Sequence, residues 1–148
     1  ADSLGIHGAY DVITAFRFFK NAEDELRISA TKNLQELIKK SGFFIFDLHL
    51  NTFSLIGLVA SLIRITRLYK PLKINPLAIR TISLRTIRKI FKESEFEIID
   101  FYGMGILPGR RNFTLLPAPI LLTFERWITT HKLLRYFCYN ILVFARKK

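Results

Sequence analysis

Apolar residues along the chain fall into short runs of strand length and longer stretches with helical spacing. The runs at 10–16, 43–48, 96–102 and 139–145 are rich in β-branched and aromatic residues, which predicts four strands. The run at 43–48 is continuously apolar rather than alternating. This pattern is typical of a strand that is buried on both faces in a parallel sheet.

Helical spacing fills the segments between these strands. Apolar side chains recur at helical intervals over 22–40, and we expect Asn21 to cap this helix and Gly42 to supply the turn that ends it. Ser83 is the expected cap of a second helix, and a third is expected over 120–134. The inward face of the third helix should comprise Leu121, Phe124, Trp127 and Ile128.

The order of these elements indicates an α/β fold in a single domain. Strand, helix and strand joined by short links form a βαβ unit, and the pattern repeats along the chain. Residues 52–69 should be helical but irregular, because Gly57 interrupts them. The longest apolar stretch, 43–63, contains charged and amide side chains at one end, which disfavours a membrane-spanning helix.

Candidate site residues follow from the sheet itself, because ligands of open α/β sheets bind at the carboxyl ends of the strands. Three groups of side chains come at or just after the predicted strand ends. These are Thr14, Ala15, Phe16, Arg17, Phe18 and Phe19; then Asp47, His49 and Asn51; then Tyr102, Gly103, Met104 and Gly105. We expect the functional site to lie where these groups meet.

Asp47, His49 and Asn51 alternate along the chain, so in an extended segment they point to the same side. His49 has three interpretations: a general base that accepts a proton from an attacking oxygen, a hydrogen-bond partner of the substrate, or a structural contact. One histidine and one carboxylate are too few ligands for a metal ion, so no metal is expected.

Arg17 lies within an aromatic run and has two interpretations. It either steers an anionic substrate at the strand end or pairs locally with Glu23 or Asp24. Cys138 is the single cysteine, which excludes an internal disulfide, and we expect a buried, inert thiol.

The charge balance adds candidate partners. The net charge of +11 favours an anionic partner such as a lipid surface, a nucleic acid or a phosphorylated substrate, although codon bias toward lysine would also produce it. Basic residues crowd 64–92, next to the apolar segment 53–68, and form either a membrane-surface patch or a solvated face. Nucleic acid is disfavoured, because these basic residues lack interleaved aromatic side chains.

The motifs together resemble one enzyme family. Residues 10–19 (YDVITAFRFF) resemble the fourth strand and following loop of class I, Rossmann-like, S-adenosylmethionine-dependent methyltransferases. Residues 37–47 (LIKKSGFFIFD) are similar to the fifth strand of that family, 83–99 (SLRTIRKIFKESEFEII) to its next helix and strand, and 140–147 (NILVFARK) to its closing antiparallel strand. The resemblance implies the last four strands of a methyltransferase sheet, mostly parallel, and S-adenosylmethionine as cofactor.

The resemblance also implies site roles. His49 would be the catalytic base, and residues 52–80 and 103–119 would form a substrate lid. The cofactor side would comprise Asp2, Thr14, Ala15 and Phe16, and the acceptor side Arg17, Asp47, Asn51, Tyr102 and Met104. The strand-end motifs further resemble a bacterial subgroup that acts on cell-surface glycan or lipid-linked substrates, so the expected acceptor is a small molecule, a glycan or a lipid-linked group.

One departure from the family qualifies this picture. The glycine-rich G-x-G-x-G cofactor loop does not occur in the chain, nor does the acid that ends the second strand of the family. We therefore interpret residues 1–148 as an incomplete, substrate-side methyltransferase domain that binds S-adenosylmethionine poorly by itself. We expect a cytoplasmic protein without a signal peptide, in peripheral contact with the inner face of the membrane. The alternative is a non-enzymatic basic protein that binds anionic membranes.

Overall fold

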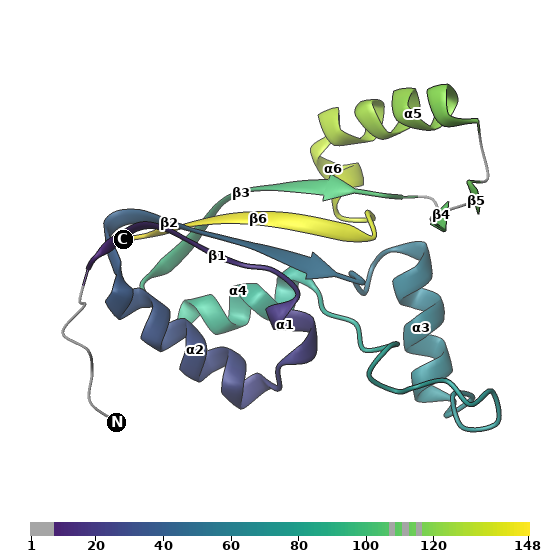
Figure 1. Ribbon diagram of the computed structural model, residues 1–148, viewed down its shortest axis with the longest axis horizontal. Coiled ribbons are helices and arrows are strands. Elements are labelled where there is room, and N and C mark those ends of the chain that lie inside the picture. Colours follow the sequence, from purple (N-terminus) through teal and green to yellow (C-terminus); the bar gives the residue numbers. More distant parts are fainter. Residues whose placement is uncertain (1–7, 107–108, 111–112, 115–116) are drawn as a thin grey trace.

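The computed structural model describes residues 8–106, 109–110, 113–114 and 117–148, and its central element is a four-stranded sheet. β1 (Tyr10–Ala15) pairs in parallel with β2 (Ile38–His49). β6 (Asn140–Lys147) runs antiparallel to both of its neighbours, β2 and β3 (Phe96–Met104). The order is β1-β2-β6-β3, so β1, β2 and β3 all point the same way (Figure 1). This confirms the expected α/β class, with four strands of which the last closes the sheet antiparallel.

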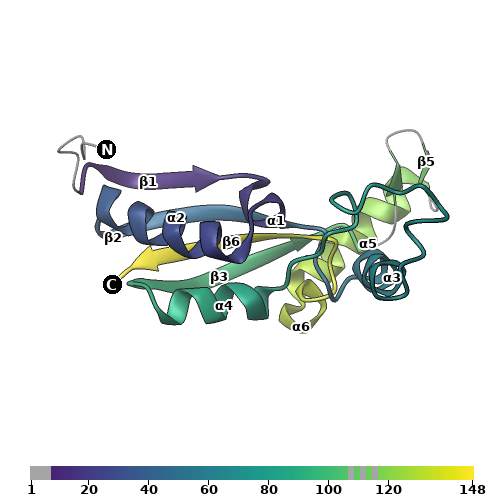
Figure 2. The same ribbon diagram turned by 90° about the horizontal axis from the view of Figure 1, so that it is seen from below.

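The helices lie on one face of the sheet and at one of its ends. Below the sheet in Figure 1 lie α1 (Phe18–Asn21), α2 (Asp24–Leu37) and α4 (Leu84–Lys92). At the end to which β1, β2 and β3 point stand α3 (Leu55–Ile65), α5 (Ala118–Thr130) and α6 (Lys132–Arg135), as Figure 2 also shows. β4 (Gly109–Arg110) pairs antiparallel with β5 (Phe113–Thr114). No helix of the described residues is long and apolar enough to cross a membrane.

Phenylalanine side chains dominate the core between the sheet and the helices beneath it. The rings of Phe44 and Phe46 on β2 lie 4.8 Å apart, centroid to centroid, and Phe19 from α1 packs 4.6 Å from Phe46. Phe91 of α4 and Phe96 of β3 complete the cluster, and all five are at most 4% exposed. Tilted and edge-to-face rings of this kind stabilise a core beyond the burial of apolar area alone.

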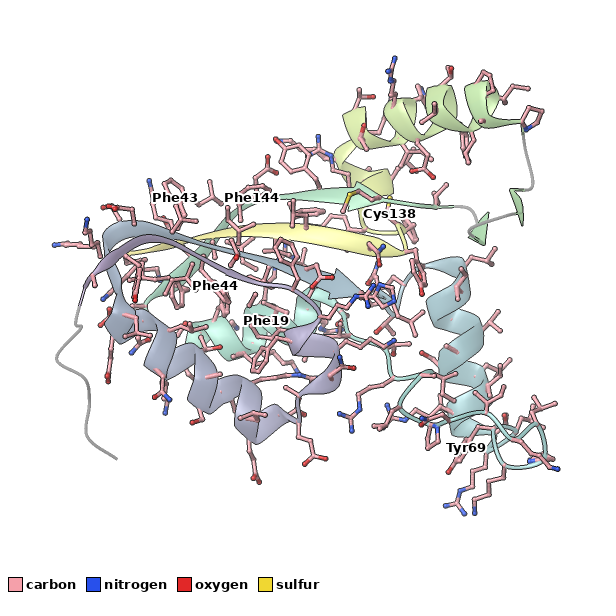
Figure 3. All side chains as sticks on the ribbon, in the orientation of Figure 1. Phe19, Phe43, Phe44, Tyr69, Cys138 and Phe144 are labelled. Carbon is pink, nitrogen blue, oxygen red and sulfur yellow. The ribbon has the colours of Figure 1, made fainter. Side chains whose placement is uncertain are left out.

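The opposite face of the sheet is only partly covered. Figure 3 shows Phe43 and Phe144 pointing away from the side on which Phe19 and Phe44 lie. Phe43 is 42% exposed and Val12 of β1 is 49% exposed. The expectation that the run 43–48 is buried on both faces is therefore wrong for this structure, because only its inner face is packed against helices.

Several expected boundaries differ because main-chain contacts override local signals. The helix expected over 22–40 ends at Leu37 and passes directly into β2, so Gly42 lies inside the strand. A Cβ on Gly42 would lie 2.7 Å from the side chain of Ile38, so the glycine allows close approach within β2 rather than ending a helix. Asn21 is the last residue of α1, and its amide donates to the carbonyl of Arg17 at 2.9 Å instead of capping α2.

The Ser83 cap is confirmed, because its hydroxyl accepts a hydrogen bond from the amide of Thr86 at 3.2 Å. The helix expected over 120–134 breaks at His131 into α5 and α6. Its predicted inward face is correct for Ile128, which is fully buried, but wrong for Trp127, which is 51% exposed.

Candidate functional site

The candidate site lies at the shared carboxyl ends of β1 and β2. Each strand is followed closely by a residue with left-handed backbone, Arg17 (φ 58°) and Leu50 (φ 61°). Neither is glycine, and such conformations cost energy that the surrounding structure must repay. They turn the chain sharply at the rim, so the side chains that follow β1 and those that end β2 are brought together. Because β1 and β2 pair in parallel, both strands end at the same end of the sheet.

Asp47 connects the two strand ends. Its carboxylate accepts a hydrogen bond from the backbone N–H of Arg17. The side chain of Arg17 remains exposed. The local pairing considered for Arg17 is not found in the described part of the chain, since Glu23 lies 3.8 Å from Arg80 and Asp24 pairs with Arg27. The guanidinium of Arg17 is therefore available at the mouth of the site.

His49 is the titratable group of this rim that is best placed for proton transfer. Its Nε2 lies 3.2 Å from the hydroxyl of Tyr139, and the two rings meet edge to face with centroids 5.0 Å apart. Burial lowers the pKa of His49 below its ordinary value, the charge of Lys20 lowers that pKa further, and Asn140 and Asp47 act in the opposite direction. The imidazole is therefore neutral near pH 7, the state in which a general base can accept a proton.

This lowered pKa predicts a pH-dependent stability. The unfolded chain protonates His49 near its ordinary pKa of 6.5, whereas the folded chain protonates it only at lower pH. The free energy of unfolding should therefore fall as the pH drops below about 6.5, because protons bind more tightly to the unfolded chain. Urea titrations monitored by circular dichroism should show a shallower fall for His49→Gln than for the unchanged protein. Equal pH slopes would contradict this assignment.

Asn51 lies in the protein interior and not at the rim. It is fully buried, and its side-chain amide donates to the carbonyls of Tyr136 at 2.6 Å and Cys138 at 3.0 Å. Both amide hydrogens are thus used, so Asn51 holds the loop before β6 against the end of β2 rather than facing the rim. The expected alternation is interrupted at Leu50, whose left-handed backbone turns Asn51 inward.

The third group of expected residues lies across the sheet. Met104 pairs across from Asn140 on β6, and Asn140 pairs across from His49 on β2, so these three residues form one row. Met104 is 46% exposed. Tyr102 is 43% exposed, and its ring contacts the guanidinium of Arg135 at 4.8 Å. Met104 and Tyr102 therefore border the same face as His49, two strands away.

The expected cofactor-side residues are only partly described. Asp2 lies outside the described residues. Thr14 and Phe16 are exposed at the end of β1, Phe16 by 60%, whereas Ala15 packs against the core.

Two site residues escaped the sequence reasoning, Tyr139 and Asn140. Tyr139 directly precedes β6 and Asn140 is the first residue of β6. Both lie beside His49 only because β6 pairs antiparallel with β2, although the two strands are far apart in the sequence. The side-chain oxygen of Asn140 is buried without a hydrogen-bond partner among the described residues. No local sequence signal marks such a pairing, because it depends on the register of two distant strands.

Comparison with solved structures identifies the fold. The chain aligns with an S-adenosylmethionine-dependent methyltransferase of Archaeoglobus fulgidus with a TM-score of 0.54 and 12% identity, covering 96% of this chain and 61% of that one. It aligns with a Thermotoga maritima S-adenosylmethionine-dependent methyltransferase with a TM-score of 0.56 and 14% identity, covering 99% and 60%. A Haloferax volcanii methyltransferase solved with the Trm112 activator gives a TM-score of 0.56 at 13% identity, covering 99% and 57%.

No protein family matches the sequence, and no curated protein does. The chain has the fold of S-adenosylmethionine-dependent methyltransferases and spans about three fifths of the length of these structures. This fold does not favour the alternative of a non-enzymatic membrane-surface protein.

Proposed function

We propose that this chain is the acceptor-side part of an S-adenosylmethionine-dependent methyltransferase that methylates a small molecule, a glycan or a lipid-linked group. The observation that carries the proposal is the shared rim of β1 and β2, where Arg17, Asp47 and His49 meet in a methyltransferase fold. Methyl transfer requires chiefly that donor and acceptor be aligned, with a base nearby if the acceptor is a hydroxyl. The rim offers such a base and an exposed cation.

The described residues form only one wall of a cofactor site. None of the described links that follow β1 and β2 contains a glycine-rich turn that leads into a helix, so no backbone there can approach a nucleotide closely. β1 is also an edge strand, and Tyr10 and Val12 on it are 46% and 49% exposed. S-adenosylmethionine therefore does not fit these residues alone, and we propose that upstream residues supply the rest of the sheet and of the cofactor site.

Within this proposal, His49 accepts the proton of the acceptor hydroxyl and Arg17 attracts an anionic acceptor. Tyr102 and Met104 border the acceptor on the far side. Asp47 positions Arg17 through its backbone N–H.

The proposed lid comprises residues 52–80 and 103–119, of which 107–108, 111–112 and 115–116 lie outside the described residues. The part at 52–80 carries α3, which packs inward on a small cluster of Leu50, Ala60 and Ile79. The start of the part at 103–119 is fixed to α5, because the carboxylate of Glu125 accepts hydrogen bonds from the backbone of Gly105 at 2.9 Å and Ile106 at 3.1 Å.

The test compares the 148-residue chain with a protein extended by the residues that its reading frame encodes before Ala1. Isothermal titration should show S-adenosylmethionine binding to the extended protein and none to the shorter chain. In the extended protein, His49→Ala should lower turnover by about 100-fold or more and leave cofactor affinity unchanged. An extended protein that binds no S-adenosylmethionine would refute the proposed function, and unchanged turnover would remove His49 from the mechanism.

A further inference from the structure

The outer surface of α3 is apolar where it faces away from the protein. The side chains that share this surface are spaced for one face of a helix and are 51–80% exposed: Leu55, Leu58, Val59, Leu62 and Ile65. The opposite face of α3 is the one that packs inward, through Gly57 and Ala60. A helix at a protein surface normally presents polar residues to water. A contiguous exposed surface of leucine, valine and isoleucine instead marks a contact site.

The loop after α3 extends this surface and adds positive charge. Leu68, Leu72 and Leu77 are 46–57% exposed. Arg64, Arg67, Lys70 and Lys73 are exposed around them, and none forms an ion pair among the described residues. No acidic residue occurs between Asp47 and Glu93. We call the exposed side chains of residues 55–77 the α3 face. Tyr69, labelled in Figure 3, belongs to the same segment but is half-buried and packs inward against Leu50, Ala60 and Ile79.

We propose that the α3 face docks on the surface of an anionic lipid bilayer. Apolar side chains that alternate with lysine and arginine in one surface match the two layers of a membrane interface, since the leucines enter the acyl boundary and the cations stay among the phosphates. A nucleic acid would match the charge but not this surface, which offers aliphatic rather than stacking side chains.

The position of the α3 face gives the docking a consequence for the site. α3 stands at the end of the sheet to which β1 and β2 point (Figure 1). Docking would therefore hold the rim with His49 close to the lipid surface. The inference itself does not rest on the proposed function, because lipid binding requires neither cofactor nor methyl transfer.

The test is sedimentation of the 148-residue chain with phosphatidylcholine vesicles that contain phosphatidylglycerol, and with pure phosphatidylcholine vesicles. We expect binding to the anionic vesicles that weakens as salt is raised. Each basic residue near such a surface contributes about a five-fold factor, so Arg64→Glu with Lys70→Glu should weaken binding at least about 25-fold. Ile65→Ser, at the most exposed apolar position, should weaken binding about ten-fold.

Matched control variants distinguish docking through the α3 face from a general effect of net charge on vesicle binding. Lys32→Glu with Lys40→Glu makes the same charge change at exposed positions away from the α3 face, and Leu26→Ser removes an apolar side chain that is 54% exposed on α2. These variants should bind nearly as well as the unchanged protein. All variants concern exposed side chains, and circular dichroism should show them folded. The proposal is overturned if anionic vesicles do not bind the chain, or if the controls lose as much affinity as the variants of the α3 face.

Discussion

Phe44→Ala should lower the free energy of unfolding by about 3–5 kcal/mol, whereas Phe43→Ala should lower it by less than about 1 kcal/mol. The two phenylalanines are neighbours on β2 but point to opposite faces of the sheet (Figure 3). Phe44 is fully buried, with its ring centroid 4.8 Å from Phe46 and 5.5 Å from Phe96. Phe43 is 42% exposed, so its removal leaves no cavity.

Urea unfolding monitored by circular dichroism measures both changes. If Phe44→Ala is unfolded without urea, Phe44→Leu provides a milder truncation that should still cost more than Phe43→Leu. Equal losses for the two positions in the 148-residue chain would contradict the assignment of the inner face.

Gly57→Ala should destabilise the protein by about 1–3 kcal/mol, although alanine is the better helix former by about 1 kcal/mol. A Cβ at this position would lie 1.9 Å from the backbone oxygen of Asn51, a distance that only a shift of α3 can relieve. The same oxygen accepts a hydrogen bond from the hydroxyl of Ser54 at 2.7 Å, and Ser54 in turn caps α3 at the amide of Gly57. Displacing α3 therefore breaks its attachment to the end of β2.

The sign of this change makes the experiment decisive. Thermal unfolding of Gly57→Ala should occur at a lower temperature than that of the unchanged protein. Leu58→Ala, at the next position on the exposed side of the same helix, should change the unfolding temperature little. A gain in stability for Gly57→Ala would mean that the close contact between α3 and Asn51 does not form.

The elements were predictable from sequence where local chemistry decides them. Ser83 caps its helix as expected, and the run 43–48 forms the centre of β2. The prediction that Asn21 caps the helix over 22–40 was wrong, because the chain forms the separate short helix α1 before α2. The prediction that Trp127 faces inward was wrong, because helical spacing alone does not determine which side of α5 packs against the rest of the protein. Boundaries and faces of this kind are settled by packing, which no short window of sequence contains.

The candidate site was also predictable only in part, because some of its contacts are local in sequence and others depend on packing. Asp47, His49 and Arg17 were selected because ligands of open α/β sheets bind at the carboxyl ends of the strands. In the structure these three residues lie together at one rim. Asn51 was expected to share that rim, but the left-handed backbone at Leu50 turns it inward. The partner of His49 at Tyr139 depends on how β6 aligns with β2, which spacing along the chain does not encode.

The position of β6 between β2 and β3 has a consequence for how the chain folds during synthesis. Among the described strands, β3 is hydrogen-bonded to β6 alone, and β6 comprises residues 140–147. While the ribosome is still making residues up to 139, β3 has no neighbour to join, and β2 keeps one side open. Such unpaired strands in a nascent chain are sites of misassembly, so β3 and one edge of β2 remain open to wrong partners until β6 has been made.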